Sequence, residues 1–401
     1  YIMIPKNFQK KILKNGITIL QEYRDLPLVS FSISNRFGGA YEDSNIKGIA
    51  HFIEHLVFTG TKTRTHEDIS REIEKKGGIL NAYTSNEVTS FWFKLPSEHL
   101  FSGMDIITDM LNNAVFEEKK FEKEKKVIIE EIKMYHDAPQ RFVHDQIEEN
   151  LFDKPLGEGV IGSVETVSAL KRDFVFDFFK KMYQPSNFIV TLVGKADFKK
   201  VCDYIEKNFK SSKVVLKIKP IKKLNKETVE ERPGIDQAHY VFAFHTPLQT
   251  DKNYPALEVL DAYLANGMSS KLFLEIREKR GLAYAVKGSL STEKNYSYYT
   301  IYAGTTKKAI PEVQKLILQE FDNVKNITEK DIKEAKDQLI GLKRLSKEDS
   351  SSVMNELLFS ELTTKAEDYY KHEDNIKAVT ISQVKELAKI SSFSTAAIVP
   401  K

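Results

Sequence analysis

His51-Phe-Ile-Glu54-His55 is the stretch of this 401-residue chain that indicates most about its fold and chemistry. In an α-helix, residues four apart lie one above the other, so His51 and His55 can direct a ring nitrogen toward the same metal ion. Glu54 falls beside them. A single histidine on an apolar helix is usually a hydrogen-bonded core residue, but two at this spacing are typical of a zinc site.

The residues around this motif predict a buried helix. Apolar side chains recur there at helical spacing, at Ile49, Phe52, Ile53, Leu56 and Val57. Ser44 is a suitable N-cap upstream, and Gly60 is a suitable end downstream. The motif is therefore expected on a helix with an apolar back and a polar front.

A hydrolytic zinc site needs a third protein ligand and one open position. Residues 117–136, EEKKFEKEKKVIIEEIKMYH, are strong helix formers and are the best source of this ligand. Glu124 and Glu131 lie nearly two turns apart there, so they share a face, which Val127 and Ile128 between them indicate is at least partly buried. Glu130 points elsewhere. In so charged a helix, either carboxylate taken alone would be interpreted as part of a solvated face.

Together the two segments resemble the inverted-motif zinc peptidases, the family of pitrilysin, insulin-degrading enzyme and mitochondrial processing peptidase. The short, two-domain bacterial members that are similar to processing peptidases are the best match. The resemblance implies one Zn²⁺ per subunit, held by His51, His55 and Glu131. It also implies that Glu54 is the general base for the attacking water and that Glu124 orients a ligand or the water.

A second feature of this family occurs at Glu275-Ile-Arg277-Glu-Lys-Arg280-Gly281-Leu-Ala-Tyr284. The segment resembles the family's Arg/Tyr pair, which implies that Arg277 and Tyr284 contact the substrate backbone and the oxyanion. A guanidinium and a phenol can stabilise negative charge that develops on a scissile carbonyl. Without the zinc motif, these arginines would be interpreted as ordinary surface charge.

Residues 77–95 predict the end of a helix followed by two strands around Ser85-Asn86-Glu87. In the family this region resembles, the strand with Asn81, Ala82 and Tyr83 is a free edge to which an extended peptide adds. Main-chain hydrogen bonds at such an edge give affinity without selecting side chains. The residues alone fit a plain hairpin equally well.

Composition is that of a globular protein, with 41% hydrophobic and 29% charged residues. A net charge of +3, from 60 basic and 57 acidic residues spread along the chain, gives no reason to expect nucleic acid. The sequence contains no run of eighteen apolar residues, so no membrane span is predicted. The single cysteine, Cys202, excludes an internal disulfide and is expected in a helix core. The sequence does not distinguish the bacterial cytoplasm from the periplasm.

The order of predicted elements favours an α+β fold with two structurally similar domains, each a mainly antiparallel sheet packed with helices. An N-terminal zinc-binding domain is expected at 1–212, a Lys- and Pro-rich linker at 213–233, and a C-terminal domain with the Arg/Tyr pair at 234–401. Gly157-Glu-Gly-Val-Ile-Gly162 lacks the context of a nucleotide loop and predicts a flexible loop capped by Ser163. Four histidines in no motif are interpreted as ordinary surface or core residues: His144, His239, His245 and His372.

The predicted function is that of a zinc-dependent endopeptidase acting on oligopeptides or unfolded segments. Relatives that work as unlike pairs carry the zinc motif on one subunit and the Arg/Tyr pair on the other, whereas this chain carries both. The expected assembly is therefore a homodimer with composite active sites around a chamber. One alternative is a non-catalytic core or scaffold subunit of the same fold. Another is a structural metal closed by a fourth ligand, for which His66, His99 and His136 are candidates.

Overall fold

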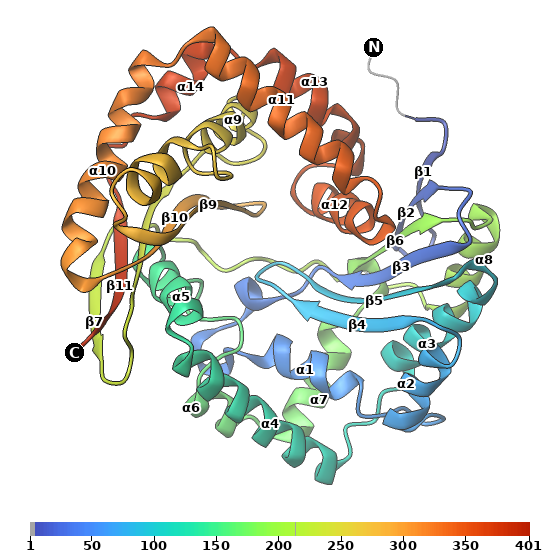
Figure 1. Cartoon of the computed structure of the whole chain (residues 1–401). Helices are drawn as coiled ribbons and strands as arrows, with labels where there is room; N and C mark the ends of the chain where they lie inside the picture. The colour runs from blue at the N-terminus through green and yellow to red at the C-terminus, as the bar shows by residue number, and fades with distance from the viewer. Residues whose placement is uncertain (1–4, 213) are drawn as a thin grey trace. The chain divides into compact units, whose positions relative to one another are not determined.

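The computed structural model describes residues 5–212 and 214–401, which form an α+β fold with two similar domains. Two compact units make up the chain (Figure 1). Unit 1 contains Tyr1–Lys133, Glu158–Pro220 and Ser346–Tyr369. Unit 2 contains Met134–Gly157, Ile221–Leu345 and Tyr370–Lys401.

The sheet of unit 1 has the strand order β1-β2-β6-β3-β5-β4. Within it β2 and β6 run parallel, and the other neighbours are antiparallel. Its strands are β1 (Phe8–Ile12), β2 (Thr18–Tyr23), β3 (Leu28–Asn35), β4 (Ile79–Thr84), β5 (Thr89–Pro96) and β6 (Phe188–Gly194). The strand β4 pairs with β5 as a hairpin and is the last strand of the sheet, as the family resemblance implied.

The sheet of unit 2 repeats this topology. Its order is β7-β11-β8-β10-β9, with β7 and β11 parallel and the other neighbours antiparallel. The strands are β7 (Glu227–Arg232), β8 (Ala238–His245), β9 (Ala283–Thr292), β10 (Ser297–Thr305) and β11 (Ser394–Pro400). In position and direction, β2 to β6 correspond one by one to β7 to β11. The expected internal repeat is therefore present, and the edge strand β9 is the counterpart of β4.

Helices and the sheet of unit 1 enclose one apolar core, to which Phe31, Phe52, Phe93, Phe121 and Ile128 contribute fully buried side chains. Most of these helices pack on one face of the sheet, and their apolar positions follow the helical period. The helices are α1 (Ile49–Val57), α2 (His66–Glu74), α3 (Leu100–Asn113), α4 (Glu118–Asp137), α6 (Val164–Ala169), α7 (Arg172–Met182), α8 (Phe198–Asn208) and α12 (Ser350–Thr363). Cys202 lies buried in α8, as predicted.

Unit 2 has its own core, built from Phe242, Leu260, Ile301 and Ile317 among others. Its helices are α5 (Pro139–Leu151), α9 (Tyr254–Leu264), α10 (Ile310–Asn323), α11 (Glu329–Ser346), α13 (His372–Ala378) and α14 (Ile381–Leu387). A π-helix spans Phe273–Glu278. In the part of the chain that the structure describes, no helix is both long and apolar enough to span a membrane.

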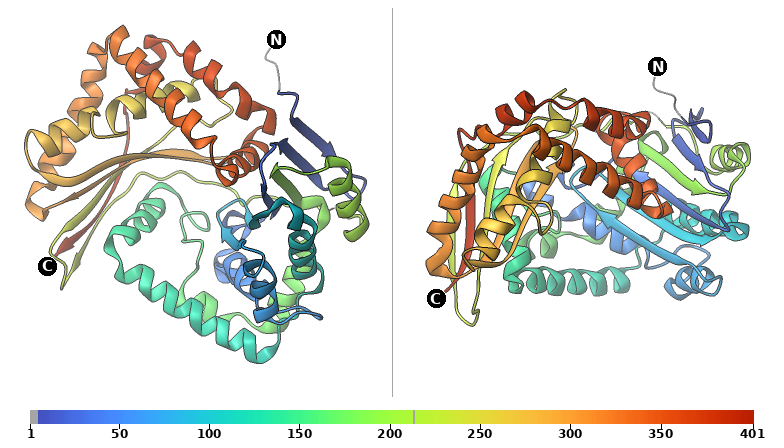
Figure 2. Two further views of the ribbon diagram at one scale, coloured as in Figure 1. Left: turned by 45° about the vertical axis from the view of Figure 1, so that its right-hand side comes forward. Right: turned by 45° about the horizontal axis from the view of Figure 1, so that its top comes forward.

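Each unit receives one helical segment from the other half of the sequence. Helix α5 packs on β8 and β11 of unit 2, and α12 packs on β3 and β6 of unit 1, as the views in Figure 2 show. The contacts therefore group residues 134–157 and 346–369 differently from the contiguous division at 1–212 and 234–401, which stays a prediction. The predicted linker 213–233 contains strand β7, because residues 227–232 pair in parallel with β11.

Candidate metal centre and active site

The helix that carries the zinc motif starts later than predicted. Gly48, with φ of +96°, precedes the first residue of α1, and Ser44 lies in a separate 3₁₀ turn instead of capping the helix. The cap comes from Glu42, whose carboxylate accepts hydrogen bonds from the backbone N–H of Gly48 (3.1 Å) and Ala50 (2.7 Å). Negative charge at a helix N-terminus is stabilised by the unpaired N–H groups there. The helix ends at Val57, before Gly60.

Residues behind α1 are buried and tightly packed. Glu42 is fully buried, and its carboxylate lies 3.8 Å from the Lys47 ammonium, which donates a hydrogen bond to the Gly39 carbonyl. A Cβ atom on Gly48 would lie 2.6 Å from the Ile161 carbonyl oxygen, and one on Gly162 would lie 2.4 Å from the Lys47 carbonyl oxygen. The loop that ends at Gly162 is thus a packing surface for the start of α1. Ser163, which was expected to cap this loop, is the N-cap of helix α6.

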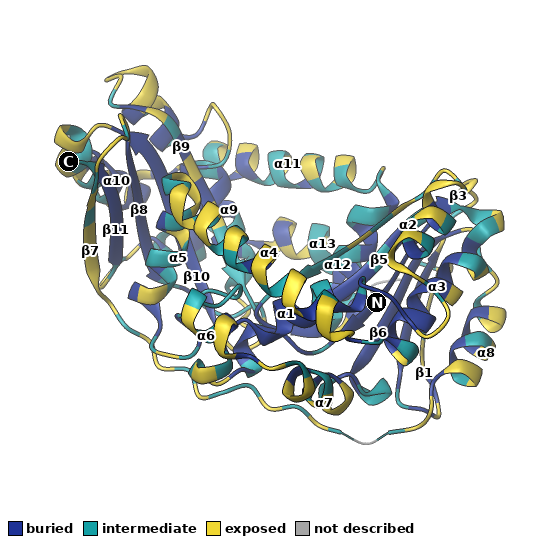
Figure 3. Cartoon of the chain, turned by 90° about the horizontal axis from the view of Figure 1, so that it is seen from below, coloured by how far each residue is buried: buried dark blue, intermediate teal, exposed yellow. Residues whose placement is uncertain are grey.

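Helix α4 supplies the carboxylates. Most of its residues are exposed, with Phe121 and Ile128 buried against the core (Figure 3). Val127 was expected beside Ile128 on a partly buried face, but its side chain is 43% exposed because that position lies toward solvent. Glu130 is exposed and pairs with Lys133, as expected from its direction.

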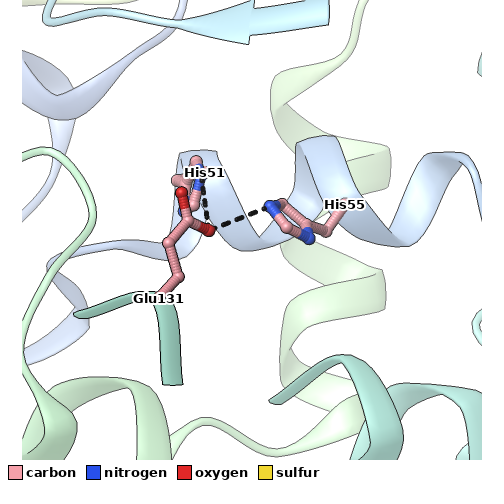
Figure 4. A group of neighbouring side chains, drawn as sticks. All are labelled: His51, His55 and Glu131. Atoms are coloured by element: carbon pink, nitrogen blue, oxygen red, sulfur yellow. Dashed lines mark ion pairs between the residues drawn. The ribbon is translucent and has the colours of Figure 1, made fainter. Parts of the chain in front are cut away.

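The side chains of His51, His55 and Glu131 converge (Figure 4). Glu131 Oε2 lies 3.8 Å from His51 Nε2 and 3.5 Å from His55 Nε2. One ligand atom from each residue can be chosen so that all three lie within 4.8 Å of one another. Two imidazole nitrogens and a carboxylate oxygen thus point to one position between α1 and α4.

The two histidines differ in their electrostatic environment. Burial, together with the neighbouring His55, lowers the pKa of His51, so this ring is neutral. Burial also acts to lower the pKa of His55, but hydrogen bonds with Glu124 and Glu131 outweigh it and raise that pKa to about 9. His55 Nδ1 lies 3.4 Å from Glu124 Oε2. Because Glu124 accepts the Nδ1 proton, the Nε2 proton is the one that a metal ion would displace, and the Nε2 lone pair would then be directed at the common position.

These residues fit a zinc ion. Tetrahedral zinc with bonds of about 2.0–2.2 Å to nitrogen and oxygen places its ligand atoms about 3.3–3.5 Å apart, close to the separations found here. A His₂Glu set is a known catalytic arrangement, because the fourth position stays open. In the described part of the chain, no fourth histidine, cysteine or acidic residue joins the group. A closed structural site completed by His66, His99 or His136 is therefore not supported.

Glu54 lies beside this group and is linked to the sheet. Thr84, at the end of β4, donates a short hydrogen bond from its hydroxyl to Glu54 Oε2. Burial raises the pKa of Glu54, while the contacts with Thr84 and His55 act in the opposite direction. A carboxylate with a raised pKa can take up a proton near neutral pH, as a general base must.

A cleft of about 420 Å³ opens beside His55 and the strand β4. Glu54 and His55 line one side, Leu80 and Asn81 belong to the strand, and Phe58 adds an apolar wall. Ala82 is partly buried on the core side, whereas Tyr83 stacks on Phe359 of α12 on the opposite face. The outer edge of β4 is the part of this sheet that faces the cleft without a neighbouring strand.

The predicted Arg/Tyr pair lies in unit 2. Arg277 is in the π-helix, with its guanidinium 4.7 Å from the Phe273 ring centroid, and its side chain is 43% exposed. Gly281, with φ of +61°, makes the turn into β9, and Tyr284 follows as the second residue of that strand. Both polar groups are accessible on the same unit.

Two family models match this chain over successive stretches of the sequence. The family described as "Insulinase (Peptidase family M16)" matches residues 22–164, and the one described as "Peptidase M16 inactive domain" matches residues 169–339. An uncharacterized zinc protease of Streptomyces coelicolor is 33% identical over 370 residues, with 88% of this chain and 80% of that protein covered. The chain belongs to peptidase family M16. It is a member of the short, two-domain type.

Other M16 relatives and solved structures agree with this assignment. An uncharacterized zinc protease of Bacillus subtilis is 30% identical over 387 residues, with 94% of this chain and 93% of that protein covered. The structure of a protease from Helicobacter pylori has a TM-score of 0.91 at 20% identity and covers 98% of this chain and 99% of its own. The likeness in fold therefore extends over both units.

Two residues of this M16 site were not identified from the sequence. Thr84 contacts Glu54, and Glu42 caps α1, yet neither belongs to the zinc motif. For Thr84, the signal was its place in the same strand as Asn81. For Glu42, an acidic residue a few positions before the glycine that starts a helix was the available signal.

Proposed function

We propose that this chain is a zinc-dependent endopeptidase that hydrolyses oligopeptides or unfolded segments. The supporting observation is that Glu54 lies on the same helical turn as His51 and His55 while Glu131 faces both rings. Zinc, when bound, polarises a scissile carbonyl and makes water nucleophilic at neutral pH. One ion per subunit is proposed, since each chain has one such group in its described residues.

In this proposal the other side chains move protons and fix orientations. Glu54 Oε2 accepts the hydrogen bond from Thr84. Oε1 is therefore the atom that would take the proton of the attacking water and pass it to the departing amine. Glu124 accepts the Nδ1 proton of His55 and so keeps the ring in the tautomer that presents Nε2.

Substrate binding is proposed at the outer edge of β4. An extended peptide that pairs with Asn81, Ala82 and Tyr83 would run past Glu54, because the same strand ends at Thr84. The cleft beside Leu80 and Phe58 would receive a side chain next to the scissile bond. Binding through the main chain accounts for action on many sequences.

We further propose a homodimer with composite active sites around a closed chamber. Each site would combine the zinc-binding residues of one subunit with Arg277 and Tyr284 of the other, which steady the substrate backbone and the developing oxyanion. The presence of both motifs in one chain supports this arrangement.

The first test is cleavage of a fluorogenic, unstructured peptide of about fifteen to twenty residues, a length that threads easily into a closed site. Activity should disappear with a chelator and return with zinc. The substitution Glu54→Gln should keep zinc, measured by elemental mass spectrometry, and lower turnover by about a hundredfold to ten-thousandfold. Glu130→Gln, on the exposed side of α4, is the matched control and should be fully active.

Near-normal turnover by Glu54→Gln would refute the role of Glu54. Protein that binds zinc but cleaves none of several peptides would favour the alternative, a non-catalytic core or scaffold subunit.

A further inference from the structure

Tyr284 lies in a cradle formed by a glycine of the neighbouring strand. A Cβ atom added to Gly304 would lie 2.3 Å from Tyr284 Cε1, 2.5 Å from Cζ and 2.7 Å from the hydroxyl oxygen. Those distances are far below van der Waals contact, so any other residue at position 304 would displace the ring. The phenol is thus held against the sheet, although its side chain is 46% exposed.

A hydrogen-bonded chain leads from this phenol into the sheet. The hydroxyl oxygens of Tyr284 and Tyr302 lie 3.3 Å apart, and the Tyr302 hydroxyl lies 2.8 Å from His239 Nδ1. Strand register explains the arrangement: His239 of β8 pairs with Gly304 of β10, and Tyr302 is two residues before Gly304 on the same face. Three polar groups and a glycine from three adjacent strands therefore meet at one place.

This place is not part of the apolar core of unit 2. The alternate residues of the same strands, including Tyr240 and Ile301, belong to the core on the other face of the sheet. The side of His239 and Tyr302 is the one on which α5 packs, with the His144 ring centroid 5.8 Å from that of Tyr302. His239 is 7% exposed, which is unusual for a histidine without an ion-pair partner among the described residues.

The protonation states limit the directions that the hydrogen bonds between His239, Tyr302 and Tyr284 can take. Burial lowers the pKa of His239, so the imidazole is neutral, and burial raises the pKa of Tyr302. A neutral imidazole has one donor and one acceptor nitrogen, and each phenol has one proton. If His239 carries its proton on Nδ1, it donates to Tyr302, which then donates to Tyr284. The proton of Tyr284 is then directed away from the sheet.

We propose that His239 and Tyr302 are positioning residues for Tyr284, forming a one-way donor chain that directs its hydroxyl proton toward a substrate carbonyl. The inference rests on the proposed peptidase function, in which Tyr284 touches the substrate. It revises the interpretation of His239 as an ordinary histidine. Gly304 contributes because its lack of a side chain lets the Tyr284 ring lie against the sheet.

Steady-state kinetics on the full-length, zinc-loaded enzyme test this proposal. Tyr302→Phe should lower kcat by about five- to tenfold, the effect of losing one oriented hydrogen bond, with KM changed less than about twofold. Tyr284→Phe should lower kcat by about tenfold or more. The double variant should be no slower than Tyr284→Phe alone, because a chain that acts only through Tyr284 has no effect without its hydroxyl.

Substitutions at His239 separate hydrogen bonding from packing. Asn places an amide close to the position of Nδ1, so His239→Asn should keep at least about half of the activity, whereas His239→Leu should fall to the level of Tyr302→Phe. Tyr240→Phe removes a phenol hydroxyl from the core face of the same sheet, where it donates to Gln314, and is the matched control with unchanged kcat. Thermal unfolding of each variant checks that folding is intact.

A measurement without substrate tests the direction of the chain. The ¹⁵N chemical shifts of His239 in the resting protein should be those of the Nδ1–H tautomer, and the Nε2–H form would overturn the proposed direction.

Additive losses in the double variant, or full activity of Tyr302→Phe, would overturn the positioning role itself. Failure of the proposed function would give a different result. Either the wild-type protein would cleave no peptide, or Tyr284→Phe would cleave as fast as the wild type.

Discussion

The hydroxyl of Thr84 donates a hydrogen bond to the carboxylate of Glu54, and so joins the edge strand β4 to the helix that carries the zinc motif. The two residues are 30 positions apart in the sequence. Thr84 has its backbone in the strand and its side chain on Glu54. In the proposed binding mode, a peptide that pairs with β4 would thereby lie in register with Glu54.

Thr84→Ala should lower kcat by about tenfold, because the Glu54 carboxylate loses the hydrogen bond that fixes one of its oxygens. Zinc content should stay the same. Thr84→Ser keeps the hydroxyl and is the control, with kcat expected within about twofold of wild type. Equal losses in both variants would show that strand packing, and not the hydrogen bond, is what matters.

Glu124→Ala should weaken zinc binding by about ten- to a hundredfold, since ligand histidines lose affinity when the group that orients them is removed. The affected atom is His55 Nδ1, 3.4 Å from Glu124. Competition with a chromophoric chelator measures the affinity. Glu122→Ala, on the same helix and 51% exposed at its side chain, should bind zinc normally.

Glu42→Ala should destabilise the protein by about 3 kcal/mol, because a buried charge pair is broken and two N–H groups at the start of α1 lose their acceptor. Urea unfolding of the zinc-free protein measures the change. Asp43→Ala is a neighbouring control: this exposed residue pairs with Lys219 on the surface, and its loss should cost less than about 1 kcal/mol. A similar result for both variants would contradict the capping role.

Asp109→Asn should destabilise the protein at pH 7 by about 2 kcal/mol and much less at pH 3. Burial acts to raise the pKa of Asp109, but hydrogen bonds from Thr61, Asn113 and Arg64 outweigh it and lower that pKa. A lowered pKa stabilises the folded state at pH values above the unfolded pKa of 3.8, and this stabilisation is lost as the pH falls below it. Urea unfolding at the two pH values checks the prediction, with Asp105→Asn as the control.

Mixing two impaired variants tests the composite sites. Subunits with Glu54→Gln and subunits with Tyr284→Phe, exchanged at equal amounts, should recover about a quarter of wild-type activity, since half of random dimers are mixed and each holds one intact site. Sites contained within a single subunit would leave only the residual activity of the Tyr284→Phe subunits. Light scattering that finds an active monomer would exclude the dimer altogether.

The sequence allowed prediction of the parts of the site that depend on helical periodicity. His51 and His55 are four residues apart on α1, and Glu124 and Glu131 are seven apart on α4, so each pair shares a face on any regular helix. In the structure, Glu131 lies within 3.8 Å of both histidines and Glu124 lies 3.4 Å from His55. Spacing along one helix is a local property, which a single sequence contains.

Relations between distant segments could not be predicted in this way. The contact of Tyr302 with His239 depends on the register of β8 and β10, and the cap of Glu42 on α1 depends on how a loop packs. Helices α5 and α12 were not expected to pack with the sheet of the other half, because nothing in their own composition specifies a partner. Strand β7 was hidden by its Lys- and Glu-rich context, since its pairing with β11 involves only the backbone.

The position of β4 at the end of its sheet also bears on how products leave. A peptide that binds through main-chain hydrogen bonds would bind more tightly the more of its residues pair with the strand. In the proposed peptidase, cleavage would divide that number between two fragments, so each fragment would bind more weakly than the intact chain. Hydrolysis would thus loosen the enzyme's own hold on its products, and short peptides would accumulate free instead of blocking the strand.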